Sequence, residues 1–408
     1  MAYLTYNDMS QLTRKMYAQM TGREPIGNVP FGDFQNVFLT ALANNDDSLF
    51  NVIPTVLCDT VVSMRPYSRK LSGMVWSEQK FGDYVRKITP ILTADDTDFE
   101  NKEYQIGKEL DKTSGQDFSG ITKPIREKVL LTFVSNGQTF DRKVTFYRNQ
   151  LNAAFQSQGE LERYFSAKLT EISNIYEQDL ENVARAQIAN VSIVLDDAGK
   201  ESPTTGNPCR TEQCFHAISE YATETGYAMS ENNIYDPQNF RPFMIWLAAK
   251  LDTLRDNLSN RTTFYHANFT GLDVNRHTPV NKMRMYLLSS FANYFDRNTA
   301  EIFNPDKLGL GDYEKVAFWQ SLENPSQIKG SAVCPNKAGD TLITLNNKTV
   351  DNVIGLITDV DMFGICPVDQ HASPEPYNAV WDYRNTHNKY TFKTPVDFTE
   401  NAILIKLD

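Results

Sequence analysis

The chain has 408 residues, of which 41% are hydrophobic and 22% are charged, and its formal net charge is −11 at pH 7. This length is enough for about two or three compact units with sizeable cores. The acidic balance argues against a protein that grips nucleic acid irrespective of sequence, because phosphate contacts need a basic surface. The longest apolar run, residues 243–249, is too short to span a bilayer, and the N-terminus lacks the apolar core of a signal peptide. We therefore expect an intracellular product without a membrane partner.

The cysteines are scattered and odd in number, which disfavours a disulfide framework and favours a reducing compartment. Three potential ligands, Cys209, Cys214 and His216, lie close together in a C-x4-C-x-H arrangement. A zinc site would need a fourth ligand at a matching spacing, and the neighbouring sequence offers none. We therefore expect loop cysteines without a metal, and no cofactor.

The first 150 residues alternate between extended and strand-like patterns. Residues 1–40 contain the segment GREPIGNVPFGDF, whose glycines and prolines are typical of an extended arm. Residues 74–92 and 128–133 are rich in β-branched and aromatic residues and flank a polar, largely acidic stretch. Asn136 and Gly137 form a two-residue turn signal before a further strand candidate. The pattern predicts a long β-hairpin with a large polar tip, and such a hairpin cannot bury both faces within its own chain.

Residues 157–190 predict one long amphipathic helix. Ser157 and Glu160 form a capping box at its start. Its length would be on the order of 50 Å. The apolar residues recur at steps of three and four, which keeps them on one face: Leu161, Phe165, Leu169, Ile172, Tyr176, Leu180 and Val183. The helix could serve as a spine for other elements or be one helix of a bundle.

The rest of the chain alternates between helix and strand patterns, which favours an α/β unit with a central sheet. We expect a strand at 191–195 and a linker at 196–208. The predicted helices cover residues 240–258, 281–295 and about 312–322. Strands are predicted at 341–345, 353–358, around Phe363, at 389–398 and at 402–407.

The sequence offers little that is typical of catalysis. Gly309 and Gly311 begin a dinucleotide-binding pattern that lacks its third glycine and a preceding strand. Asp359 and Asp361 follow a predicted strand, and turn residues at a strand end explain them more simply than a carboxylate pair does. The histidines have no serine- or cysteine-centred partner motif. These observations favour a structural building block.

The order of the elements resembles that of the major capsid protein of tailed double-stranded-DNA bacteriophages, the HK97 fold, and is most similar to the phi29-like podoviruses (picovirus-type). Four stretches carry the resemblance, and they begin CDTVVSMRPYSRKLSGMVW, LERYFSAKLTEISNIYEQDLENV, TPVNKMRMYLLSSFANYF and AVWDYRNTHNKYTF. It covers most of the chain but contains no single diagnostic motif.

The resemblance implies an α+β chain of the HK97-type capsid fold. Its segments would be an N-terminal arm (1–40), a first part of the P-domain (41–70), the E-loop hairpin (71–140), the P-domain spine helix (141–192), an α/β A-domain (193–375) and the C-terminal P-domain strands (376–408).

The resemblance also implies a function. The chain would be a structural head protein without enzymatic activity that assembles with itself into hexamers and pentamers of an icosahedral or prolate shell. That shell would enclose double-stranded DNA without sequence-specific binding. A separate scaffolding protein and a portal would be further partners. Assembly would take place in the cytoplasm of the host bacterium, and the product would be the virion capsid.

We predict that complementary charges mediate the contacts between subunits. The acidic hairpin tip would supply one side: Asp95, Asp96, Asp98, Glu100 and Glu103. Basic residues of the arm, of the segment before the spine and of the spine would face neighbouring subunits: Arg14, Lys15, Arg142, Lys143, Arg148, Arg163 and Lys168. Such pairs contribute little singly, and their role would be to set the register of the contact.

Two alternatives stay open at the level of sequence. A non-viral compartment could use a shell protein of the same fold. Less favoured is an intracellular α/β enzyme with Asp359, Asp361 and His371 near strand ends.

Overall fold

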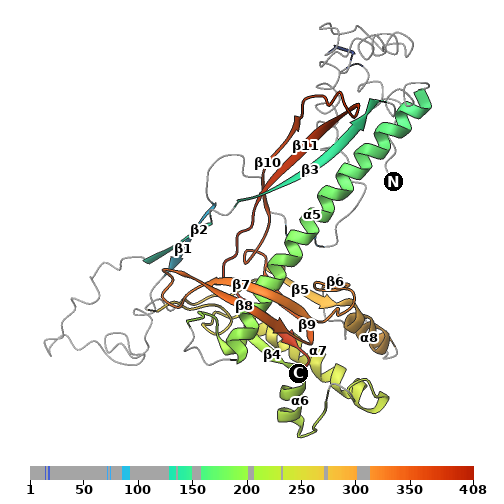
Figure 1. The fold of residues 1–408 in the computed structure, drawn as a ribbon. Coiled ribbons are helices and arrows are strands. Elements are labelled where there is room, and N and C mark those ends of the chain that lie inside the picture. The colour runs from blue at the N-terminus through green and yellow to red at the C-terminus, as the bar shows by residue number, and fades with distance from the viewer. Residues whose placement is uncertain are drawn as a thin grey trace, which may run out of the picture. The chain divides into compact units, whose positions relative to one another are not determined.

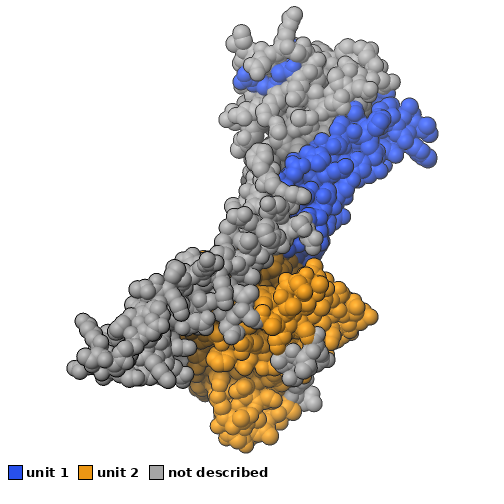
Figure 2. Space-filling model, turned by 90° about the vertical axis from the view of Figure 1, so that its left-hand side faces the viewer, with its two compact units in different colours: residues 1–82, 136–186, 364–394 blue, residues 83–135, 187–363, 395–408 orange. Residues whose placement is uncertain are grey.

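The computed structural model describes residues 14, 17, 18, 71, 74, 85–91, 128–134, 137–148, 158–200, 206–230, 233–270, 274–300 and 313–408. The chain divides into two compact units (Figure 2). Unit 1 comprises residues 1–82, 136–186 and 364–394, and unit 2 comprises 83–135, 187–363 and 395–408. Most of the predicted arm and the acidic hairpin tip lie outside the described residues.

Unit 1 contains an antiparallel three-stranded sheet in the order β10–β11–β3. Its strands are β3 (Gly137–Tyr147), β10 (Cys366–Pro374) and β11 (Tyr383–Lys393). The helix α5 runs beside this sheet (Figure 1). The Tyr176 ring of α5 lies 4.8 Å from the Tyr390 ring and 5.9 Å from the Phe392 ring, measured between centroids. Aromatic contacts therefore hold the helix against the sheet.

Helix α5 (Gln158–Lys200) is 43 residues long and contributes to both units. The prediction of one long helix is confirmed. The predicted strand at 191–195 is wrong, as is the start of the linker at residue 196, because the helix continues to Lys200. Every side chain from Val191 to Ala198 is buried. A helix that is buried on all sides loses the one-sided pattern by which helices are recognised.

Unit 2 is built on a five-stranded sheet in the order β4–β12–β9–β5–β6. Its strands are β4 (Cys214–His216), β5 (Met283–Leu288), β6 (Glu314–Val316), β9 (Val353–Asp359) and β12 (Ala402–Lys406). β9 pairs antiparallel with both β12 and β5, and the outer strands β4 and β6 join in parallel. All residues of β9 and β12 are buried, so these two strands form the centre of the core.

Helices α6 (Ala217–Thr225), α7 (Pro237–Ser259) and α8 (Ser289–Ala300) belong to the same unit (Figure 1). Two short 3-10 turns, η5 (Thr211–Gln213) and η6 (Val280–Lys282), precede β4 and β5. The Tyr221 ring of α6 meets the Phe243 and Trp246 rings of α7 edge-on, at 5.5 and 5.2 Å. These rings fix the packing of the two helices.

Two antiparallel hairpins complete unit 2. They are β1 (Val85–Ile91) with β2 (Lys128–Val134), and β7 (Ile328–Pro335) with β8 (Leu342–Val350). The pairing of β1 with β2 confirms that the strands flanking the acidic stretch form a hairpin. The hairpin turn expected at Asn136–Gly137 is wrong, because β2 and β3 lie in different sheets and β3 pairs with β11.

Several predicted elements of unit 2 are confirmed, namely the helix at 240–258 and the strands at 341–345, 353–358 and 402–407. The residues around Phe363 form a single bridge with Val396. The helix predicted at 281–295 is wrong in its first half, where β5 enters the central sheet. The helix predicted at about 312–322 is also wrong. There, β6 leads into turns in which the buried Trp319 donates from Nε1 to the Val353 carbonyl at 2.9 Å.

The central sheet leaves no room for a side chain at Gly355 of β9. A Cβ atom there would lie 2.7 Å from Leu287 Cδ2 and 3.1 Å from the Tyr286 carbonyl oxygen. We expect Gly355→Ala to lower the free energy of unfolding by about 1–3 kcal/mol through overpacking, as measured by urea denaturation. Gly137→Ala in β3 is the matched control, because its Cβ would have its nearest contact, Thr391 Cγ2, at 3.8 Å. Equal losses in the two variants would contradict the steric explanation.

Candidate functional site at the base of the β1 and β2 hairpin

The predicted contact residues fall into three groups in the structure. Lys15 and the five acidic residues of the hairpin tip lie outside the described residues. Arg163 lies in α5, but its side chain is not among those described. Arg14, Arg142, Lys143, Arg148 and Lys168 are described. The predicted meeting of acidic tip and basic segment therefore stays a prediction.

Most of the described basic residues have partners within the chain. Arg142 of β3 forms a two-pronged ion pair with the buried Asp179 of α5, and its Nε lies 2.7 Å from Asp179 Oδ2. The Lys168 ammonium lies 3.4 Å from Glu171 one turn further along α5. Arg142 thus stabilises unit 1 itself, because bidentate guanidinium–carboxylate pairs are the stronger kind.

Arg148 has a partner within the chain, whereas the Lys143 side chain is exposed. Arg148 is next to Asp382, with its backbone N–H donating to the Asp382 carbonyl at 3.1 Å and its guanidinium 4.0 Å from the carboxylate. The Lys143 side chain is exposed and takes part in no ion pair with a described residue, while the backbone of Lys143 pairs with His387 of β11. Among the described members of the predicted basic set, Lys143 is the one best placed to meet an outside partner.

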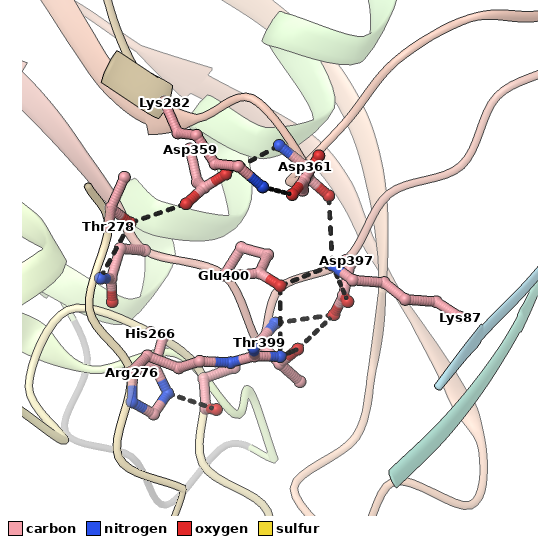
Figure 3. Close-up of polar contacts among 12 residues, drawn as sticks. Lys87, His266, Arg276, Thr278, Lys282, Asp359, Asp361, Asp397, Thr399 and Glu400 are labelled. Carbon is pink, nitrogen blue, oxygen red and sulfur yellow. Dashed lines mark hydrogen bonds and ion pairs between the residues drawn. The ribbon is translucent and has the colours of Figure 1, made fainter. Parts of the chain in front are cut away.

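A charge network that the sequence did not indicate lies where β1 meets the segment after β11 (Figure 3). The Lys87 ammonium of β1 lies 2.6 Å from Glu400 Oε1 and 2.9 Å from Asp397 Oδ2. Only 8% of each acidic side chain is exposed, compared with 27% of Lys87. Lys87 also donates to the Asp361 carbonyl at 3.3 Å. One lysine therefore ties the hairpin near its base to the loop that leads into β12.

The second cation of the network is Arg276. Its guanidinium lies 3.2 Å from Glu400 Oε1 and donates to Thr399 Oγ1 at 3.2 Å. The Thr399 backbone N–H and hydroxyl both donate to Asp397 Oδ1, at 2.9 and 2.6 Å. Two cations thus face two carboxylates, and the two Thr399 hydrogen bonds occupy the second oxygen of Asp397. A buried charge network of this kind holds together because nearly every charge is compensated.

The strand-end carboxylates continue the network. Asp359 accepts from the Thr278 hydroxyl at 2.8 Å and from the Asp361 backbone N–H at 2.8 Å. Asp361 forms an exposed ion pair with Lys282 at 2.9 Å. These contacts confirm the interpretation of Asp359 and Asp361 as turn residues. The third residue of the enzyme alternative, His371, belongs to unit 1 and pairs with Asp369 at 2.7 Å.

The electrostatics follow from this arrangement. Burial alone would lower the pKa of Lys87, but Asp397 and Glu400 outweigh it and raise that pKa above its ordinary value. Burial alone would raise the pKa of Asp397, and the Lys87 ammonium together with the Thr399 hydrogen bonds lowers it instead. Both groups are therefore charged across the neutral range.

A second buried network lies at the end of β12. The Lys406 side chain is only 2% exposed, and its ammonium lies 3.0 Å from both Asp196 of α5 and Asp408. His216 Nδ1 donates to the Asp408 backbone oxygen at 3.0 Å, and Nε2 of the same ring lies 3.5 Å from Cys214 Sγ. Hydrogen bonds to Asp408 and Cys214 raise the pKa of His216 to about 10. The sequence cluster of Cys214 and His216 thus serves to join β4 to the final strand.

The described residues contain no arrangement typical of catalysis by a metal or thiolate. No three His, Cys, Asp or Glu side chains among them gather in a way that could hold a metal ion. The described cysteines are buried free thiols, and burial raises the pKa of Cys334 to about 12. None of the described helices combines the length and apolar character needed to cross a bilayer. The charged groups around Lys87 pair with one another, and this pairing can hold the β1–β2 hairpin in position.

We expect Lys87→Met to lower the free energy of unfolding by about 3 kcal/mol, because it leaves the buried Asp397 and Glu400 with one cation fewer. Hydrogen exchange of β1 and of residues 395–401 should rise in parallel. The Asp397 contribution should be present above its unfolded pKa near 3.8 and fade as pH falls through the lowered folded value. The Lys87 contribution should fade only as pH rises above 10.5, through its raised value.

Lys282→Met is the matched control, because its ion pair with Asp361 is about half exposed on both sides. Such a pair contributes roughly 0–1 kcal/mol. Similar losses in the two variants, or an acid midpoint unchanged by Lys87→Met, would contradict the role given to the buried network.

Comparison with known proteins gives a likeness at the level of structure only. No protein-family model and no curated protein matches the sequence. A chain from the capsid structure of Staphylococcus phage Andhra is similar over 81% of this chain and 82% of its own, with a TM-score of 0.50 and 14% identity. A chain from the structure of the head fiber and inner core protein gp22 of native bacteriophage P68 is similar over 84% and 85%, with a TM-score of 0.51 and 14% identity.

The two likenesses extend over most of both partners, so they concern the whole architecture and not one shared motif. Their sequence identity is low, and what they establish is the fold. The fold class predicted from the sequence is confirmed: the chain has the α+β, HK97-type capsid fold.

Proposed function

We propose that the chain is a structural major capsid protein that assembles with itself into a closed shell around packaged double-stranded DNA. One observation carries this proposal: the likeness to chains of phage particles covers more than four fifths of this chain. The buried charge networks support it, because they use their ionisable groups for internal contacts. A catalytic role would need such groups to face a substrate.

The segments would then divide the work of assembly. The β1–β2 hairpin, with its tip beyond the described residues, would be the E-loop that lies across an adjacent subunit. Helix α5 and the β10–β11–β3 sheet would form the P-domain, and the five-stranded sheet with α6, α7 and α8 would form the A-domain. In this scheme β12 (Ala402–Lys406) would belong to the A-domain, whereas the resemblance alone placed residues 376–408 in the P-domain. In this scheme the contact of Lys87 with Asp397 and Glu400 sets the direction in which the E-loop leaves its own subunit.

The finer features of the proposal rest on the order of elements in the sequence. They are a kinship with phi29-like podoviruses, hexameric and pentameric capsomers, a separate scaffolding protein, a portal and assembly in the bacterial cytoplasm. The acidic surface fits a wall that encloses DNA without gripping it, because firm phosphate contacts would need clustered Lys and Arg.

The direct test is to produce the full chain, with and without a co-expressed scaffolding protein, and to examine it by negative-stain electron microscopy. We expect regular closed particles, and nuclease-protected DNA inside those recovered from phage-infected cells. Regular shells that never protect DNA would favour a non-viral compartment. If the chain stayed monomeric under all conditions, the proposal would be overturned and the enzyme alternative would be favoured.

A charge-swap experiment tests the predicted contact between the acidic tip and the basic segment. We expect the triple variant Asp95→Lys, Asp96→Lys, Asp98→Lys to lose assembly, because its tip would meet Lys143 of a neighbour with like charge. Adding Lys143→Glu should restore particles. Each exposed pair contributes only about 0–1 kcal/mol, so three tip residues are changed together.

Arg142 provides the internal comparison for this experiment. It is engaged by Asp179, so Arg142→Met should destabilise the subunit, and no change at the tip should rescue it. Normal particles from the triple variant, or failure of Lys143→Glu to restore them while the thermal stability of the subunit stays unchanged, would contradict the predicted contact.

A further inference from the structure

The face of the three-stranded sheet that points away from α5 carries a histidine between two carboxylates. Arg142 of β3 pairs with Asp179 of α5, so the preceding residue, Asp141, points to the opposite face, because side chains alternate along a strand. His387 lies on the central strand β11, with Nδ1 2.8 Å from Asp141 Oδ2 and Nε2 2.5 Å from Glu375 Oε1. Glu375 directly follows β10. One imidazole thus connects the edge strand β3 to the end of β10.

The two contacts of the His387 ring require a particular protonation state. A neutral imidazole carries one N–H, so it can donate to one carboxylate while its other nitrogen presents a lone pair to the second. An imidazolium donates from both nitrogens and supplies the positive charge that strengthens both hydrogen bonds. Hydrogen bonds to Glu375 and then to Asp141 raise the pKa of His387 above its ordinary value of 6.5. The bridge is therefore complete below 6.5, and one half of it is lost as pH rises through the raised folded value.

Further charged groups surround this bridge on the three strands. By strand register, those on the same face are Lys143 of β3, Lys389 of β11, and Asp369 and His371 of β10. His371 and Asp369 pair with each other at 2.7 Å. Glu375 also accepts from the Asn385 amide at 2.6 Å, and its backbone carbonyl accepts from Arg384 Nε at 2.6 Å.

Lys143 is the cation placed to respond when the bridge opens. It lies opposite His387 in the register and two residues from Asp141 on the same face of β3. Side chains directly opposite on antiparallel strands have Cβ atoms about 4.5–5.5 Å apart, so a lysine reaches the groups around its opposite residue. Hydrogen bonds from His387 and Asn385 chiefly lower the pKa of Glu375, and the Lys143 charge adds to this effect. The ammonium of Lys143 is therefore within reach of both carboxylates of the bridge.

We infer that His387 is a pH-sensitive switch that decides whether Lys143 is free to pair with a carboxylate outside its own sheet. The inference rests on the proposed contact of Lys143 with the acidic tip of a neighbour, and it names how that contact is regulated. While His387 is protonated, it compensates Asp141 and Glu375, and the exposed Lys143 side chain is left to an outside partner. When His387 is neutral, one of these carboxylates loses its donor, and Lys143 is drawn to it.

An NMR titration of the unassembled subunit tests the bridge itself. The chain has five histidines, so ring signals of histidine-labelled protein can be assigned by substituting them one at a time. We expect the His387 ring to titrate above 6.5, and to move back towards 6.5 in Glu375→Gln, which removes the first of its two anionic partners. Asp369→Asn is the matched control, because it removes the carboxylate beside His371 and should leave His387 unchanged. Titration of His387 at or below 6.5 would overturn the inference.

The pH dependence of assembly tests the consequence for Lys143. The protein concentration needed for particle formation should rise about twofold to fivefold from about pH 6 to about pH 9, as expected for weakening one exposed ion pair per subunit. His387→Arg, which stays charged, should keep the low value throughout, and His387→Gln should show the high value throughout. His371→Gln is the matched control and should follow the wild type.

Lys143→Met separates regulation from a merely structural role of the bridge. It should need the higher concentration at every pH and lose the part of the pH dependence that His387→Arg also removes. A pH profile of Lys143→Met equal to that of the wild type, or of His387→Arg equal to that of the wild type, would overturn the inference and leave the proposed function standing. Failure of the wild type to form particles at any pH would overturn the proposed function and the inference with it.

Discussion

The constraint on which the rest of the structure depends is the environment of α5. A single helix of 43 residues supplies one face to the three-stranded sheet of unit 1 and its last turns to the core of unit 2. In its final part it is surrounded on all sides, and two of the surrounded residues are aspartates. Buried carboxylates need compensation. Lys406 lies 3.0 Å from Asp196, and Lys348 lies 2.8 Å from Asp197. The final strand and the β7–β8 hairpin are therefore linked to the helix by charge.

The sequence predicted the helix where it is half buried and failed where it is fully buried. From Leu161 to Val183 the apolar residues follow one another at intervals of three and four, as expected for a helix with one buried face. From residue 191 to 195 the letters VSIVL are equally compatible with a buried strand, since both faces of either element are covered. The same ambiguity explains the error at β5, where the letters MRMYLL enter the central sheet. Hydrophobic periodicity indicates an element that is buried on one side. The most deeply buried segments of the described chain are covered on all sides and show no such periodicity.

The hairpin and the Lys87 network show a second limit. Strand composition on either side of an acidic stretch was enough to predict that β1 and β2 pair. The partners of Lys87 follow more than 300 residues later, in the loop after β11. No local pattern distinguishes Lys87 from an ordinary exposed lysine of a strand, and the carboxylates Asp397 and Glu400 resemble ordinary turn residues. Only the fold brings them together. Conversely, the basic set predicted from charge alone contained Arg142, whose partner Asp179 lies within the same chain.

The distribution of charge separates two kinds of interaction. Inside the units, lysine, arginine and carboxylate groups lie in compensated networks, where removing one partner is costly because the others stay buried. On the described surface, Lys168 and Lys282 form ion pairs that water weakens.

A subunit of a closed shell needs this separation between strong internal contacts and weak external ones. Its own geometry must be fixed to within a small angle, because an error at the base of a hairpin grows along its length. Its contacts with neighbours must each be weak enough to break and correct during assembly, and their sum over many copies stabilises the shell. In the proposed shell, buried networks such as that of Lys87 would meet the first requirement, and an exposed side chain such as that of Lys143 would be suited to the second.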